Sequence, residues 1–226
     1  MPTLVITGAN RGIGLALARR YAEAGWTVHA TARNPTAAAA LAAVPGTKVH
    51  ALDVADQASI EALAEALDGV AVDHLINNAG VMGPRSVPFG ESQSDSWAEV
   101  LAVNVAGPWM VTERLVENLK AGAGKRVGIL SSHLGSLADA GSGWSPIYAA
   151  SKTAANMVMR QLSFQLAPAG IVVLSFHPGW VQTEMGGADA LVRPEDSAAA
   201  LFGLMNQASP EQSGGFFNYT GERLPW

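Results

Sequence analysis

The chain has 226 residues, of which 49% are hydrophobic and 15% charged, so we expect one globular domain over residues 1–226 rather than a disordered protein. Its formal net charge is −5 and no block of Lys and Arg occurs, which argues against a nucleic-acid partner. The absence of cysteine excludes disulfides and thiolate metal sites. No apolar stretch reaches the length of a bilayer span and no leader precedes the first expected strand, so we expect a cytoplasmic protein with no membrane partner.

Apolar runs along the chain alternate with segments of helical character. We expect strands at residues 4–6, 26–31, 48–52, 74–76, 126–130, 171–176 and 215–219. We expect helices at residues 15–24, 36–43, 58–67, 96–121 and 147–167, and one that begins at residue 194. The 96–121 helix should be interrupted at Gly107-Pro108, and Asp56 should cap the helix that follows it. Strands that are apolar throughout and alternate with helices predict an α/β fold, a doubly wound parallel sheet with helices on both faces.

Polar or glycine-rich clusters follow four of these strands, at residues 7–14, 77–80, 131–132 and 177–183. Ligands of doubly wound sheets lie beyond the carboxyl ends of the strands. The clusters therefore predict one site at one edge of the sheet.

The first cluster, Thr7 to Gly14, has three glycines between a strand and a helix. Glycine serves where the backbone takes a positive φ or approaches a ligand closely, and free N–H groups at a helix start bind anions. The spacing, G-x-x-x-G-x-G, is neither the G-x-G-x-x-G fingerprint nor a P-loop. A glycine turn that binds nothing is the alternative.

Tyr148 and Lys152 stand four residues apart near the start of a helix, on one face. A nearby ammonium favours the phenolate and lowers the pKa of tyrosine, which suits general acid–base catalysis. The alternative is an ordinary helix with one tyrosine and one exposed lysine.

Ser131 and Ser132 end the 126–130 strand, and by alternation one of them faces the site. A hydrogen-bonded turn is the commoner role for such serines.

Asn104 lies on the expected buried stripe of the 96–121 helix. Pro108, four residues later, has no N–H to bond the main-chain carbonyl of Asn104. That carbonyl is then free to hold a water, unless the kink has no role.

Arg33 follows the 26–31 strand at the place where NAD enzymes of this fold carry Asp or Glu for the ribose hydroxyl. Arg33, with Arg11 from the other side, suits a 2′-phosphate instead, because guanidinium–phosphate bonds are charge-assisted. A solvated surface charge is the alternative for Arg33.

These motifs have the order and spacing of one family. Thr7-Gly-x-x-x-Gly-Ile-Gly14, Asn77-Asn-Ala-Gly80, Asn104, Ser132, Tyr148-x-x-x-Lys152 and Pro178-Gly179 resemble the short-chain dehydrogenase/reductase family, which has a Rossmann-like fold. The ending Gly214 to Trp226 and the segments 131–136 and 177–187 resemble the branch of C-factor and the sniffer-type carbonyl reductases. The resemblance covers the whole chain.

The resemblance implies an NADP(H)-dependent carbonyl reductase or alcohol dehydrogenase. Tyr148 would be the acid, Lys152 would lower its pKa and bind the nicotinamide ribose, and Ser132 would hold the substrate oxygen. Asn104 would anchor a relay water through its main chain. The implied cofactor-binding residues, with Tyr148 and Lys152, are Gly8, Asn10, Arg11, Gly12, Ile13, Gly14, Arg33, Asp53, Val54, Asn78, Ala79, Gly80, Pro178, Val181 and Thr183.

We expect a small carbonyl or alcohol substrate, no metal, and a homodimer or homotetramer formed by the apolar helices at 96–121 and 147–167. The segment between Ser136 and Pro146 is longer than the family's usual spacing and borders the expected substrate position. Substrate identity is therefore not set by the resemblance, and a signalling or NADP-sensing protein is the competing reading.

Overall fold

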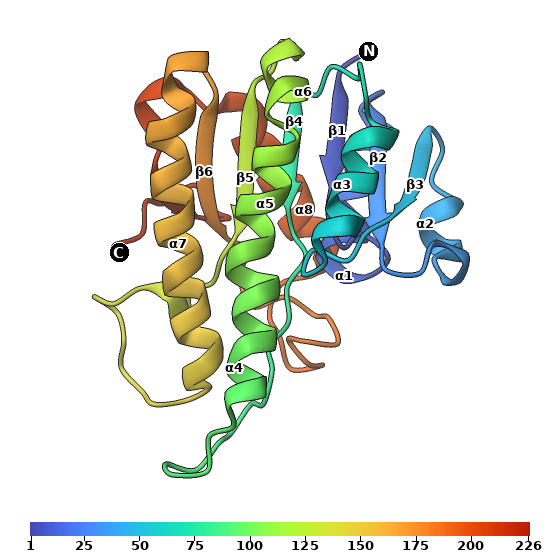
Figure 1. Cartoon of the computed structure of the whole chain (residues 1–226). Helices are drawn as coiled ribbons and strands as arrows, with labels where there is room; N and C mark the ends of the chain where they lie inside the picture. The colour runs from blue at the N-terminus through green and yellow to red at the C-terminus, as the bar shows by residue number, and fades with distance from the viewer.

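The fold is built on one seven-stranded sheet in which every neighbouring pair of strands is parallel. The computed structural model describes all of residues 1–226 (Figure 1). The strands are β1 Thr3–Ile6, β2 Thr27–Ala32, β3 Thr47–Ala51, β4 His74–Asn77, β5 Arg126–Leu130, β6 Val172–His177 and β7 Gly215–Asn218. The predicted fold class is confirmed, because a parallel sheet is covered by helices on both faces.

The strand order, β3-β2-β1-β4-β5-β6-β7, reverses direction once. The chain builds outward from β1 to β3, returns to place β4 beside β1, and then builds outward on the other side. The reversal lies between β1 and β4, where doubly wound sheets leave a crevice for a ligand.

Helices cover the two faces in separate layers. They are α1 Gly12–Glu23, α2 Ala39–Ala42, α3 Gln57–Ala66, α4 Ser94–Leu101, α5 Gly107–Arg114, α6 Val116–Ala121, α7 Pro146–Leu166 and α8 Pro194–Gln207. Figure 1 shows α3, α5 and α7 in front of the sheet, with α1 and α8 behind it.

Alternation along β1 shows why both faces are apolar. Leu4 and Ile6 belong to the core cluster that contains α1 and α8, whereas Val5 between them belongs to the cluster that contains α3, α5 and α7. Successive side chains of a strand point to opposite faces, so a strand buried on both sides must be apolar at every position.

The region expected as one helix over 96–121 has a different form. It begins earlier, with α4 at Ser94, and its middle is a π-helical turn, Ala102–Ala106, in which the N–H of Gly107 bonds the oxygen of Ala102. Pro108 then stands in the first turn of α5. The predicted break is therefore present, but it is a widened turn ahead of the proline, because a proline fits a first turn and not a helix interior.

Most other boundaries agree with the sequence within about two residues. The alanine-rich 36–43 segment is split, into a 3₁₀ turn Pro35–Ala37 and the one-turn α2. The carboxylate of Asp56 accepts the N–H of Ala58 as the expected N-cap of α3. None of the helices combines the length and the apolar character that crossing a bilayer requires.

Candidate active site

The turn between β1 and α1 brings two glycines against the loop after β4. Gly8 has φ +63°, and a Cβ on it would lie 2.9 Å from the Cα of Ala79. A Cβ on Gly14 would lie 2.5 Å from Nδ2 of Asn78 and 2.6 Å from the oxygen of Gly8. These distances are too short for any side chain, so the turn can hold this form only with glycine at both positions.

Side-chain hydrogen bonds hold the two strand ends together at this point. Oγ1 of Thr7 accepts the N–H groups of Asn78 and Ala79, each at 3.0 Å. In return, Nδ2 of Asn78 donates to the oxygens of Thr7 and Gly8, each at 2.8 Å. Thr7 and Asn78 therefore position the backbone of the site. Their place directly after adjacent strands is the sequence signal for this role.

A crevice of about 760 Å³ opens between these turns and the start of α7. Most of the predicted site residues line it: Gly8, Asn10, Arg11, Gly12, Ile13, Gly14, Arg33, Asp53, Val54, Asn78, Ala79, Gly80, Tyr148, Lys152, Pro178 and Thr183. Three predicted residues, Asn104, Ser132 and Val181, are not among the lining residues. Lining residues that the sequence did not single out include Arg19, Met82, Arg85, Gln182 and Met185.

Tyr148 and Lys152 lie together at the inner end of this crevice, on the first turns of α7. They are 7% and 5% exposed, and Nζ of Lys152 lies 5.5 Å from the centre of the Tyr148 ring. The ammonium donates to the main-chain oxygen of Leu130 at 2.8 Å. The last residue of β5 thus fixes the direction in which Lys152 points.

Burial moves the pKa values of the two groups in opposite directions, because it disfavours the charged form of each. It raises the pKa of Tyr148 to about 12, while a hydrogen bond with Ser132 acts in the lowering direction. It lowers the pKa of Lys152 to about 8. The net direction for Tyr148 is opposite to the one expected from a neighbouring ammonium. At neutral pH the phenol is therefore protonated, the form that an acid requires.

The two serines after β5 have different partners. Oγ of Ser131 donates to the main-chain oxygen of Lys152 at 3.3 Å, which commits it to holding α7. Oγ of Ser132 accepts the N–H of Leu134 at 3.2 Å, and a hydrogen bond with this serine acts to lower the pKa of Tyr148. Of the two, Ser132 is the one beside the phenol.

Asn104 lies in the π-helical turn and is 1% exposed. Its Oδ1 accepts the N–H of Val81 at 2.9 Å, and its Nδ2 donates to the oxygen of Val81 and to Oγ of Ser151. A Cβ on Gly80 would lie 3.3 Å from that Oδ1 and 3.5 Å from Nζ of Lys152. Both polar atoms of the amide side chain have partners within the protein, so a role toward a water would fall to the main chain, and this role stays a prediction.

The segment after β6 closes the crevice on the other side. Pro178 and Thr183 line it, whereas Val181 is buried and pairs with Val192 in an isolated parallel bridge. A Cβ on Gly12 would lie 3.1 Å from Cγ2 of Thr183, so this segment lies against the glycine turn.

Two arginines stand near the outer end of the crevice. Arg11 forms an exposed ion pair with Glu184, at 2.6 Å. Arg33, at the end of β2, is exposed and has no ion-pair partner. Of these two arginines, Arg33 is therefore the one whose guanidinium has no carboxylate partner.

Comparison with known proteins places most of the chain in the family that its motifs resemble. Residues 2–191 match the family model described as short chain dehydrogenase. The chain belongs to the short-chain dehydrogenase family. Among its relatives is the C-signal of Myxococcus xanthus, 41% identical over 155 residues, which are 69% of this chain and 93% of the relative.

Two solved structures of carbonyl reductases share the whole fold of this short-chain dehydrogenase. The NADPH-bound carbonyl reductase from chicken fatty liver is 29% identical with a TM-score of 0.91, over 100% of this chain and 99% of the other. The carbonyl reductase Sniffer of D. melanogaster has the same identity and TM-score, over 100% of both chains. The protein is thus an oxidoreductase by family, and the resemblance to the C-factor and sniffer branch is confirmed.

The close approach at Gly14 gives a test of the glycine turn. We expect Gly14→Ala to lower the free energy of unfolding by about 1–3 kcal/mol, because the added Cβ displaces Asn78 or the turn. Gly203→Ala in α8 is the matched control, since nothing lies within 4 Å of a Cβ there, and it should be neutral or more stable by up to about 1 kcal/mol. Urea unfolding of both variants measures this, and equal stabilities would contradict the close approach.

Proposed function

We propose that this short-chain dehydrogenase is an NADP(H)-dependent oxidoreductase that interconverts a carbonyl compound and its alcohol, with residues 1–226 acting as one domain. The observation that carries the proposal is a buried tyrosine that lines a glycine-rich crevice beside a buried lysine. Tyr148 lies one helical turn before Lys152, and a hydrogen bond with Ser132 acts to lower its pKa. A proton donor and an ammonium thus line the same crevice, and we assign the second hydroxyl of the site to Ser132.

The crevice suits a dinucleotide. Gly8 and Gly14 leave the backbone bare where it turns into α1, and such helix starts take phosphate groups. A volume of about 760 Å³ is in the range of cofactor and ligand pockets. When bound, NADP(H) supplies or accepts the hydride. The residues that would hold it are those predicted from the sequence: residues 8 and 10–14, Arg33, Asp53, Val54, Asn78, Ala79, Gly80, Tyr148, Lys152, Pro178, Val181 and Thr183.

The chain's own residues handle the proton. In reduction, Oη of Tyr148 gives its proton to the carbonyl oxygen as the carbonyl carbon gains hydride, and in oxidation it takes the proton back from the alcohol. Ser132 holds the same oxygen through its hydroxyl. Lys152, fixed by the oxygen of Leu130, stabilises the phenolate left after transfer. The main chain of Asn104 would hold a water that returns a proton to the site.

A second function is supported by the 41% identity to the C-signal of Myxococcus xanthus. In that case the crevice would bind NADP(H) in a signalling or sensing role with little turnover. The presence of Tyr148, Lys152, Ser132 and Asn104 together favours the enzyme.

The decisive experiment follows NADPH absorbance against a panel of ketones, aldehydes and quinones. We expect turnover, and we expect Tyr148→Phe to lower kcat at least about a hundredfold with the fold and NADPH binding kept, because only the transferred proton is lost. If Tyr148→Phe retained more than about a third of the wild-type kcat, Tyr148 would not be the proton donor. An inactive wild type that binds NADPH tightly would favour the signalling protein.

Cofactor choice tests Arg33. A charged hydrogen bond contributes roughly 1.5–3 kcal/mol, so we expect kcat/KM with NADPH to exceed that with NADH at least about tenfold. Arg33→Asp should abolish the preference, because its carboxylate repels a 2′-phosphate. Lys120→Asp, on α6 outside the crevice, makes the same change of charge and should keep the preference. Equal kcat/KM for both cofactors in the wild type would contradict this use of Arg33.

Assembly is tested on an apolar groove of about 490 Å³ between the 101–110 region and α7. It is lined only by apolar residues: Leu101, Ala102, Val105, Ala106, Trp109, Met110 and Val158. We propose that this face pairs with a second copy, giving a homodimer or homotetramer. Light scattering should then show a multiple of 23.4 kDa, and Ala106→Glu should shift the protein toward the monomer. A monomer mass for the wild type at high concentration would refute the pairing.

A further inference from the structure

The segment that joins Ser132 to α7 leaves the body of the protein as an exposed loop. Residues 137–144, here called the 137–144 loop, are all exposed, and they include the large apolar side chains of Leu137 and Trp144. The loop begins five residues after Ser132 and ends four residues before Tyr148. Both of its ends therefore lie close in the chain to the two residues whose hydroxyls hold the substrate oxygen in the proposed function.

The start of this segment is firmly packed. A Cβ on Gly135 would lie 2.8 Å from the main-chain carbon of Lys152, and the oxygen of Gly135 accepts from Nδ2 of Asn156 at 3.2 Å. Asn156 is in turn bonded to Ser175 of β6. Residues up to 136 are thus fixed against α7, whereas the loop beyond them is held by other contacts.

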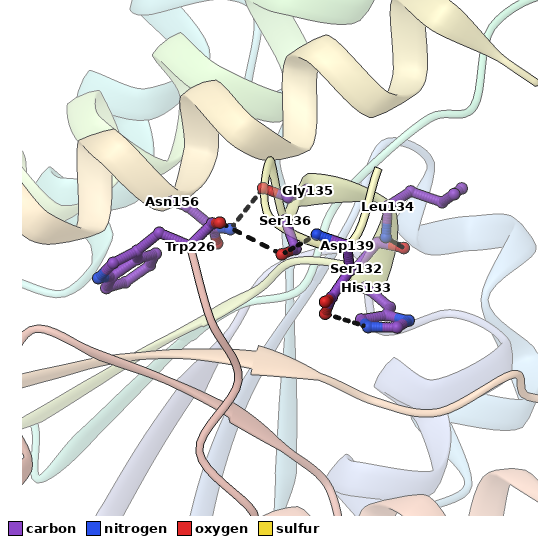
Figure 2. Close-up of polar contacts among 8 residues, drawn as sticks. All are labelled: Ser132, His133, Leu134, Gly135, Ser136, Asp139, Asn156 and Trp226. Carbon is purple, nitrogen blue, oxygen red and sulfur yellow. Dashed lines mark hydrogen bonds and ion pairs between the residues drawn. The ribbon is translucent and has the colours of Figure 1, made fainter. Parts of the chain in front are cut away.

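A side-chain hydrogen bond makes the first attachment. Nε2 of His133 lies 2.8 Å from Oδ2 of Asp139, and both side chains are partly exposed (Figure 2). His133 directly follows Ser132. The pair therefore ties the middle of the loop back to the residue next to the substrate hydroxyl.

The last residue of the sequence makes the second attachment (Figure 2). The main-chain oxygen of Trp226 accepts the N–H of Ala138 at 2.8 Å and the hydroxyl of Ser136 at 3.3 Å. The same hydroxyl of Ser136 accepts the N–H of Asp139 at 3.2 Å. One serine hydroxyl thus bridges Trp226 to Asp139, the partner of His133.

Trp226 is itself held by β7. Its ring stacks on Phe216, with ring centres 5.8 Å apart and planes at 16°, and the N–H of Leu224 bonds the oxygen of Phe216 at 2.8 Å. From residue 140 to residue 144 the chain makes no hydrogen bond or ion pair to another segment. The position of the loop therefore depends on these attachments.

We propose that His133, Ser136, Asp139 and Trp226 form a clamp that positions the 137–144 loop as one wall of the substrate pocket and so sets which carbonyl substrates fit. The clamp residues are positioning residues and do not touch the reacting atoms. The inference rests on the proposed function for its substrate, but the clamp itself does not.

The first test measures the clamp without turnover, by hydrogen–deuterium exchange of the amides of Ala138 and Asp139, which the clamp bonds. We expect Asp139→Ala and Trp226→Ala each to speed the exchange of these amides by roughly fivefold or more, because loosening an attachment breaks their hydrogen bonds more often. Asp139→Asn keeps an acceptor for His133 and Trp226→Phe keeps the ring stack, so both should stay near the wild type. Asp68→Ala, an exposed carboxylate after α3, is the matched control. Unchanged exchange in both alanine variants would overturn the clamp.

The second test measures what the clamp does. With NADPH and a bulky aryl ketone, we expect Asp139→Ala and Trp226→Ala to raise KM about five- to tenfold with kcat within about threefold, and a short aldehyde to be affected less. The NADPH dissociation constant, from fluorescence titration, should not change. A merely structural role would instead lower kcat, NADPH affinity and thermal stability together, and that result would overturn the proposal.

Two further outcomes are separable. Faster exchange with an unchanged KM for every substrate would show that the loop is clamped but is not a substrate wall, which overturns the specificity role. A wild type that reduces no carbonyl in the panel would overturn the proposed function and the substrate role with it, while the exchange result still decides whether the clamp exists.

Discussion

The site depends on the hydrogen bonds that join the ends of β1 and β4. Thr7 and Asn78 are 71 residues apart in the chain, yet each bonds the backbone of the other's turn. These bonds keep the glycine turn at the distance where a Cβ on Gly14 would not fit. Because the order of the strands reverses at this point, the same contacts define both the floor of the crevice and the direction in which α1 leaves the sheet.

Burial then decides the chemistry at the inner end of the crevice. Tyr148 and Lys152 are both buried away from water. Burial raises the pKa of the phenol and lowers the pKa of the lysine, because it disfavours the charged form of each. The phenol keeps its proton and the ammonium holds its own less strongly. A neutral phenol beside an ammonium is therefore ready to meet negative charge that develops during a reaction, and the oxygen of Leu130 keeps the ammonium in place meanwhile.

Most of the fold could be predicted from local sequence patterns, because an apolar run and the polar residues that end a strand both lie within one short segment. The strand expected at 126–130 is β5 Arg126–Leu130, and the four polar strand ends do meet at one edge of the sheet. What the sequence could not show depends on distant partners. The direction of the pKa shift of Tyr148 depends on its burial, which the sequence does not show. The ion pair of Arg11 with Glu184 joins residues far apart in the chain.

The π-helical turn at Ala102–Ala106 links two properties that otherwise have no connection. Each residue of a helix turns the chain by about 100°, so the extra residue in this turn rotates α4 relative to α5 by about that angle. The rotation places Asn104 inward against Val81 and Ser151. It also brings Leu101 and Trp109 to the same outer groove. A one-residue deletion here would therefore disturb the inner and outer faces together, so neither the buried asparagine nor the apolar groove can change its register in evolution without the other.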